Sequence, residues 1–171
     1  ESMAVAVIDL ATLDGTDGFR LARLVIPNGV NASDNIGASV SGAGDVNGDG
    51  FADLIVGAPG VDSIFVQNAG ESYVVFGKAS GFVATLDLPT LDGADGFRLD
   101  GVVTSDLTGV SVSGAGDVNG DGFADLFVGA FGADPNGQSS AGTSYVVFGK
   151  ASSFASAVDL ATLDGGGGFR L

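Results

Sequence analysis

Acidic and amide side chains alternate in a short loop that occurs twice in the chain, a pattern typical of a site for a hard metal ion. Side-chain oxygens stand at loop positions 1, 3, 5 and 9, and a glycine at position 6 lets the backbone turn sharply. The backbone carbonyl at position 7 can complete the oxygen ligands. The predicted ligands are Asp45, Asn47, Asp49, Phe51 and Asp53 in the first loop, and Asp117, Asn119, Asp121, Phe123 and Asp125 in the second.

Calcium is the ion that we expect, one Ca²⁺ in each of the two loops. Three carboxylates in one loop repel each other unless a cation lies among them. Magnesium prefers a smaller octahedron, and zinc prefers His or Cys ligands, neither of which the chain contains. An EF-hand would need a glutamate at position 12, where Val56 and Val128 stand instead. The alternative is a metal-free acidic turn, in which the carboxylates accept hydrogen bonds from the backbone.

The composition excludes several functional classes. Twenty-one Asp and Glu residues against six Lys and Arg give a formal charge of -15, which repels nucleic acid, so we expect no such partner. Without histidine or cysteine the chain lacks the commonest general base and any thiol nucleophile, and we therefore expect no enzyme activity. No apolar segment approaches the roughly 20 residues that span a bilayer, so we expect no membrane span.

The chain consists of two tandem units. Residues 41–54 are identical to residues 113–126, which lie 72 positions later, and residues 73–80 recur at the same distance as residues 145–152. A third motif occurs three times, at residues 9–21, 87–99 and 159–171, with a loop insertion at 27–33. We therefore divide the chain into a half-repeat that completes a neighbouring blade (1–21), a first unit (22–99) and a second unit (100–171).

Other polar residues have simpler explanations. Arg20, Arg98 and Arg170 recur in the third motif, and we expect each to pair with a neighbouring carboxylate. The inserted loop holds a formal N-glycosylation triplet at Asn31, but such triplets are common and we predict no glycosylation from it.

The pattern of the units predicts an all-β fold. Thirty glycines separate short apolar segments, and we expect strands at residues 19–25, 38–43, 54–57 and 73–76 with counterparts in the second unit. Residues 10–13 are either a helical turn or irregular. The small residues of 38–43 suit the crowded inner edge of a β-propeller, and segments that are apolar on both faces suit stacked blades. We predict β-propeller-type blades of four antiparallel strands, in a partial propeller or repeat array; a sandwich or solenoid is the alternative.

Two further motifs carry a family resemblance. Gly57-Ala58-Pro59 follows the acidic loop and Phe76-Gly77 closes the unit, so the sequence resembles the FG-GAP repeat of integrin alpha-subunit propellers and their bacterial relatives, over nearly the whole chain. The resemblance implies that each acidic loop lies in a hairpin of a blade and binds calcium. It also implies a propeller of about seven blades that binds protein ligands on one face. The second unit departs from the pattern at Phe131, which replaces the proline.

We therefore expect a calcium-binding extracellular module with an adhesive or scaffold role that recognises protein or glycan. Calcium is plentiful outside cells, which favours a secreted or cell-surface location. Two units cannot close a propeller, so the chain is either a segment of a longer array or assembles from copies. We expect self-association, as a homo-oligomeric ring or a head-to-tail fibre. The alternatives are a purely structural fibre subunit and the non-catalytic propeller part of a larger secreted enzyme.

Overall fold

The computed structural model describes residues 9–23, 33–62 and 66–171, which form short β-strands, turns and four 3-10 helices. No α-helix occurs in this part of the chain, so the predicted all-β class is confirmed, and none of its helical turns is long and apolar enough to cross a membrane. The inserted loop, with its triplet at Asn31, falls almost wholly outside the described residues.

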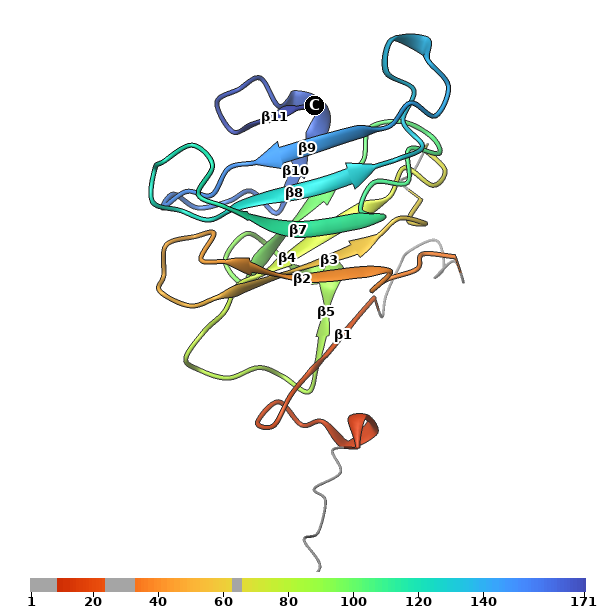
Figure 1. The fold of residues 1–171 in the computed structure, drawn as a ribbon. Helices are drawn as coiled ribbons and strands as arrows, with labels where there is room; N and C mark the ends of the chain where they lie inside the picture. Colours follow the sequence, from red (N-terminus) through yellow and green to blue (C-terminus); the bar gives the residue numbers. More distant parts are fainter. Residues whose placement is uncertain (1–8, 24–32, 63–65) are drawn as a thin grey trace, which may run out of the picture.

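Each unit forms a four-stranded antiparallel blade. In unit 1, residues 22–99, the strand order is β2, β3, β4, β6, and in unit 2, residues 100–171, it is β7, β8, β9, β11. The bounds are β2 (Ser39–Gly44), β3 (Asp53–Ala58), β4 (Glu71–Val75) and β6 (Gly96–Asp100), then β7 (Ser111–Gly116), β8 (Asp125–Ala130), β9 (Thr143–Val147) and β11 (Gly168–Arg170). Figure 1 shows the two blades stacked face to face, with β1 and β5 beyond the first blade.

In each unit a three-residue strand pairs with a strand from the segment that precedes the unit. β10 (Ala157–Asp159) comes from unit 2 but pairs in parallel with β6, the outer strand of the unit 1 blade. β5 (Thr85–Asp87) pairs in the same way with β1 (Arg20–Ala22). β10 thus covers an edge of the unit 1 blade that would otherwise present unpaired backbone groups. The sequence analysis predicted neither β5 nor β10.

Short 3-10 helices follow both linking strands. They are η2 (Leu88–Thr90) and η4 (Leu160–Thr162), and the corresponding η1 (Leu10–Thr12) confirms the helical turn considered for residues 10–13. The carboxylate of Asp9 caps η1 by accepting a hydrogen bond from the Ala11 amide. A fourth, η3 (Pro135–Gly137), lies in the loop between β8 and β9.

Small residues bring the inner strands of the two blades together. A Cβ atom built on Gly44, at the end of β2, would lie 2.6 Å from that of Ala124. One built on Gly114, in β7, would lie 2.9 Å from the carbonyl oxygen of Gly42. These separations are too short for larger side chains, so the small residues of β2 and β7 allow the two strands to approach closely.

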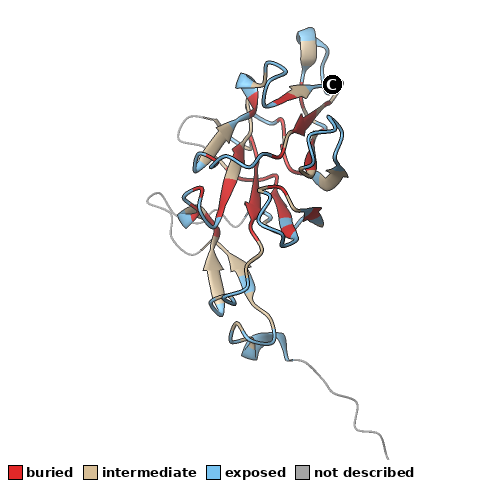
Figure 2. Ribbon diagram, turned by 90° about the vertical axis from the view of Figure 1, so that its left-hand side faces the viewer, coloured by how far each residue is buried: buried red, intermediate tan, exposed pale blue. Residues whose placement is uncertain are grey.

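The main core lies between the two blades. Ile55, Val74 and Phe97 of unit 1 form one apolar cluster with Leu126 and Val128 of unit 2. A second cluster covers the opposite face of unit 1 and includes Tyr73, Leu88 and, from β1, the partly buried Leu21. Figure 2 shows buried residues concentrated in the middle of the stack and more exposed ones towards its ends.

Candidate metal loops

Both acidic loops lie at the tip of a hairpin, as the resemblance implies. Residues 45–52 connect β2 to β3, and residues 117–124 connect β7 to β8. In each hairpin the register shifts just before the loop, between Gly42 and Gly44 and between Gly114 and Gly116. This bulge turns the strand and positions the first aspartate to face into its own loop.

The first aspartate organises the loop backbone. One carboxylate oxygen of Asp45 accepts hydrogen bonds from the amides of Gly48 (2.7 Å) and Asp49 (3.1 Å), and the other accepts one from Gly50 (2.9 Å). Gly48 and Gly50 have φ values of 77° and 87°, in the left-handed region that favours glycine. The loop therefore needs glycine at both positions to wrap around the carboxylate.

The side chains at positions 3 and 5 are also drawn together. The Asn47 amide group donates to the Asp49 carboxylate at 2.9 Å, and the Asp49 backbone amide donates to the Asn47 side-chain oxygen at 3.0 Å. The Phe51 amide donates to Asp49 at 2.8 Å. Positions 1, 3 and 5 thus share one compact turn of side-chain oxygens.

The last aspartate of the loop is buried and joins it to the rest of the blade. Asp53 is 0% exposed, and its two carboxylate oxygens accept hydrogen bonds from the amides of Val46 and Gly77, both at 2.8 Å. Burial raises the pKa of this carboxyl, the two amides lower it, and the nearby charges of Asp49 and Asp45 raise it further. The three carboxylates of the loop therefore interact electrostatically.

The second loop repeats these contacts. Asp117 accepts from the amides of Gly120 (2.7 Å), Asp121 (3.0 Å) and Gly122 (2.9 Å). Asn119 and Asp121 form the same reciprocal pair as their counterparts, and the Phe123 amide donates to Asp121. Asp125 is 0% exposed and accepts from the amides of Val118 and Gly149. Identical sequence produces identical local structure in both units.

The two loops are also in contact. The Ala124 amide donates to the Asp45 carbonyl at 3.0 Å, and the Phe123 ring lies against Gly48. Phe51, the counterpart of Phe123, is 43% exposed. The first loop is therefore covered by the second, whereas no described residue lies within contact distance of a Cβ built on Gly120, the counterpart of Gly48.

The side-chain oxygens of both loops are ligands that suit a hard cation, although the carboxylates accept hydrogen bonds from backbone amides in this structure. In the described ranges, no group of three or more acidic side chains is arranged to hold a metal ion. A carboxylate has about four acceptor positions, of which Asp53 uses two and Asp45 three. The all-oxygen set, with acceptor positions left over, fits Ca²⁺ chemically, and the ten-residue ligand set stays a prediction.

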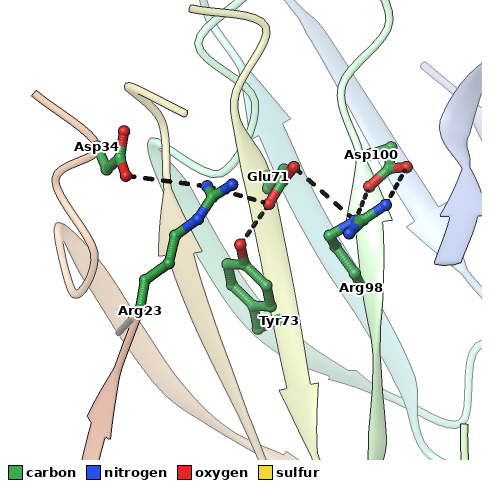
Figure 3. Close-up of polar contacts among 6 residues, drawn as sticks. All are labelled: Arg23, Asp34, Glu71, Tyr73, Arg98 and Asp100. Atoms are coloured by element: carbon green, nitrogen blue, oxygen red, sulfur yellow. Dashed lines mark hydrogen bonds and ion pairs between the residues drawn. The ribbon is translucent and has the colours of Figure 1, made fainter. Parts of the chain in front are cut away.

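Unit 1 also contains a buried ion network that the sequence analysis missed (Figure 3). Glu71 accepts a hydrogen bond from the Tyr73 hydroxyl and lies 3.6 Å from Arg23 and 3.8 Å from Arg98. Arg23 also lies 3.9 Å from Asp34. Burial raises the pKa of Glu71, and the Tyr73 hydroxyl and the two arginines lower it in part. The position of one of only two glutamates in the chain, at the start of an apolar strand, was the available signal.

The recurring arginines have different partners. Arg98 forms a bidentate pair with Asp100, as predicted. Arg20 instead donates to the Thr85 hydroxyl at 2.9 Å, across the β1–β5 pair. In unit 2, threonine at position 143 replaces the glutamate of unit 1, so the network has no counterpart there.

Comparison with known proteins finds one family and several relatives. The FG-GAP repeat matches residues 37–75 and 108–147, one match in each unit. Chicken (Gallus gallus) integrin alpha-V is 33% identical over 132 residues, which are 76% of this chain and 12% of that protein. Drosophila melanogaster integrin alpha-PS5 is 32% identical over 68% of this chain and 11% of its own length. Bovine (Bos taurus) integrin alpha-2 is 35% identical over 62% of this chain and 8% of its own length. The chain thus matches about a tenth of the length of these relatives.

Proposed function

Because this chain belongs to the FG-GAP repeat family, we propose that it is a calcium-stabilised, non-catalytic adhesive module that works outside the cell. The observation that carries the proposal is the pair of hairpin tips in which oxygens at positions 1, 3 and 5 are held together above a buried aspartate. The similarity to integrin alpha chains favours adhesion to protein or glycan.

The proposed calcium sites use this chain's own oxygens. Asp45, Asn47, Asp49 and Asp53, with the Phe51 carbonyl, would hold one Ca²⁺, and the corresponding residues of unit 2 would hold another. Burial is the main cause of the raised pKa of Asp53, and the charges of Asp49 and Asp45 add to it; a bound ion would offset this repulsion among the carboxylates. Because the loops are in contact through Ala124 and Asp45, an ordered second loop also supports the first.

Calcium titration tests the metal sites. We expect titration calorimetry to find two calcium sites per chain. The free energy of unfolding should rise by about 1.4 kcal/mol per site when calcium is at ten times its dissociation constant. Asp49→Ala and Asp121→Ala should each leave one calcium site, because each removes a ligand from one loop only. Both side chains are exposed, so we expect the fold to be kept. Asp92→Ala is the matched control, since Asp92 is an exposed turn carboxylate outside both loops. Absence of calcium binding at millimolar concentration would reject the metal sites.

The adhesive role needs a separate measurement. We expect the purified chain to bind a subset of immobilised extracellular-matrix proteins or glycans in calcium, and to lose this binding in a chelator. Binding that persists unchanged in the Asp49→Ala, Asp121→Ala double variant would separate ligand recognition from the metal. Absence of any bound component would instead favour a purely structural fibre subunit.

We also propose that copies of the chain associate with each other. Exposed apolar side chains lie on both outer faces of the two-blade stack, with Val40 and Leu54 on one face and Phe127 on the other. Apolar faces of this kind are typical of surfaces that become covered by a partner.

A further inference from the structure

The two acidic loops are joined by direct contacts between them. The Ala124 amide, next to the last ligand of the second loop, donates to the carbonyl of Asp45, the first ligand of the first loop, at 3.0 Å. The Phe123 ring covers Gly48, where an added Cβ atom would lie 2.4 Å from a ring carbon. Each loop therefore contacts the other at residues that are predicted ligands or lie next to them.

A second connection runs through hydrogen bonds to both buried aspartates. Asp125 accepts from the Gly149 amide at 2.9 Å, and the next amide along the chain, that of Lys150, donates to the Val46 carbonyl at 2.9 Å. The Val46 amide in turn donates to Asp53 at 2.8 Å. Three consecutive hydrogen bonds thus connect position 9 of one loop to position 9 of the other.

Packing holds the residue in the middle of this connection. Val46 is 0% exposed, and it belongs to the apolar cluster shared by both units, together with Leu126, which follows the buried aspartate of the second loop. The backbones also approach closely, since a Cβ atom on Gly149 would lie 2.8 Å from the Val46 carbonyl oxygen. Unit 2 therefore holds the first loop by its backbone and by a buried side chain.

We propose that the two calcium sites bind cooperatively, because each loop, when it holds its ion, orders the contacts that support the other. The inference rests on the calcium sites of the proposed function and adds an interaction between them. With an ion among its ligands, the second loop keeps Phe123 and Ala124 in place against the first. The first loop then loses less conformational freedom on binding its own ion. Coupling between binding sites is reciprocal, so the first loop strengthens the second by the same factor.

Two other influences on the sites are separable from this coupling. The hydrogen bonds within the loops are the same in both units, so the contact acts on how firmly a loop is held and not on its shape. Electrostatics acts in the opposite sense, because an ion that neutralises part of the charge on one loop weakens the attraction of the other loop for a second cation. At about 0.15 M salt the Debye length is about 8 Å, which screens this effect. The coupling is therefore best measured at that ionic strength.

Calcium calorimetry on the full chain measures the coupling as a ratio. Asp121→Ala leaves only the first site and Asp49→Ala leaves only the second, so these variants give the two single-site association constants. For independent sites, the two-ion association constant of wild type equals the product of these two constants. We expect it to exceed that product at least about fivefold, at the low end of couplings between binding sites.

The Phe123 ring can be removed without removing a predicted ligand atom, because the backbone carbonyl stays. Measured with the same two aspartate variants, Phe123→Ala should lower the ratio at least about twofold. Phe51→Ala is the matched control, since it truncates the same ring in the first loop, where Phe51 is 43% exposed. Any effect of a ring on the site of its own loop cancels in the ratio, so Phe51→Ala should keep the ratio of wild type.

Hydrogen exchange provides a readout that needs no ring substitution. In Asp49→Ala, calcium is expected only in the second loop. Its addition should nevertheless slow exchange of the Gly48 and Gly50 amides, which belong to the first loop and donate to Asp45. The expected factor is the same fivefold or so, because exchange follows the local opening that the coupling suppresses. The Ala94 amide, which donates to Asp92 in a turn outside both loops, should be unaffected.

The outcomes separate the coupling from the calcium sites themselves. A wild-type chain that binds no calcium at millimolar concentration rejects the sites and the coupling together. Two bound ions with a ratio at or below one, or first-loop exchange that does not respond to calcium in the second loop, leave the sites in place and overturn the coupling. A ratio that Phe123→Ala and Phe51→Ala lower equally overturns its assignment to the contact between the loops.

Discussion

Equivalent residues of the two units differ in burial in a regular way. Ile55 is 0% exposed and its counterpart Phe127 is 37% exposed, whereas Leu54 is 38% exposed and its counterpart Leu126 is 0% exposed. Ile55 and Leu126 lie on the faces that the two units turn towards each other, and Leu54 and Phe127 lie on the outer faces. Burial of a repeat position is therefore decided by whether another unit lies against it, as expected where each repeat contacts only its neighbours.

The acidic loops show the opposite behaviour. Their internal hydrogen bonds are the same in both units, with Asp45 to Gly48 and Asp117 to Gly120 both at 2.7 Å. This agreement holds although the first loop is covered by Phe123 and its counterpart is not. Loop geometry is thus a local property of nine residues, whereas core formation depends on the neighbouring unit.

The largest change in stability that we expect distinguishes the face of unit 1 that unit 2 covers from the outer face of unit 2. Ile55→Ala should lower the free energy of unfolding by about 2–5 kcal/mol, because it leaves a cavity in the cluster shared by both units. Phe127→Ala removes a larger side chain from the outer face but should cost about 1 kcal/mol or less in dilute solution, since that face has no neighbour to lose. Urea unfolding of both variants measures the difference. Similar losses would show that burial in the stack does not determine stability.

An added methyl group tests the same difference where residues 105–109 of unit 2 contact unit 1. Gly57→Ala should destabilise the chain by about 1–3 kcal/mol, because the added carbon overlaps the Gly109 carbonyl and must push the units apart. Gly129→Ala, at the same position in unit 2, should change stability by at most about 0.5 kcal/mol in dilute solution. Thermal unfolding at protein concentrations too low for copies to associate gives both values. If Gly57→Ala is as mild as its counterpart, residues 105–109 are not seated against unit 1.

Much of this architecture could be predicted from the repeated sequence. The acidic loop, the small strand and the two apolar strands each have a local pattern, and all of them lie where the sequence analysis placed them. The predicted strand at 19–25 is shorter, Arg20–Ala22, and residues 24 and 25 lie outside the described ranges. Local patterns identify the strands because alternation and turn residues act within a few positions.

Features that depend on distant partners could not be predicted in this way. The three residues of β10 carry no strand pattern of their own, and they become a strand only because β6 lies beside them. Asp53 was predicted solely as a metal ligand, yet its carboxylate also joins the loop to Gly77, 24 residues away. The partners of Glu71 come from three separate segments of the chain. Sequence spacing contains no information about such contacts.

The smallest effect that we expect is on the pH dependence of stability, through the ion network that only unit 1 contains. Burial raises the pKa of Glu71 above its ordinary value of 4.5, so the folded chain binds this proton more tightly than the unfolded chain. Its contribution to stability is therefore fully present below that ordinary value and is lost as the pH rises through the raised pKa. Glu71→Thr gives unit 1 the residue that unit 2 has at Thr143 and removes this contribution. In chelator, we expect the stability of wild type to decline with rising pH more steeply than that of the variant. Unfolding curves across the acidic range measure both slopes, and equal slopes would show that Glu71 does not titrate differently in the folded chain.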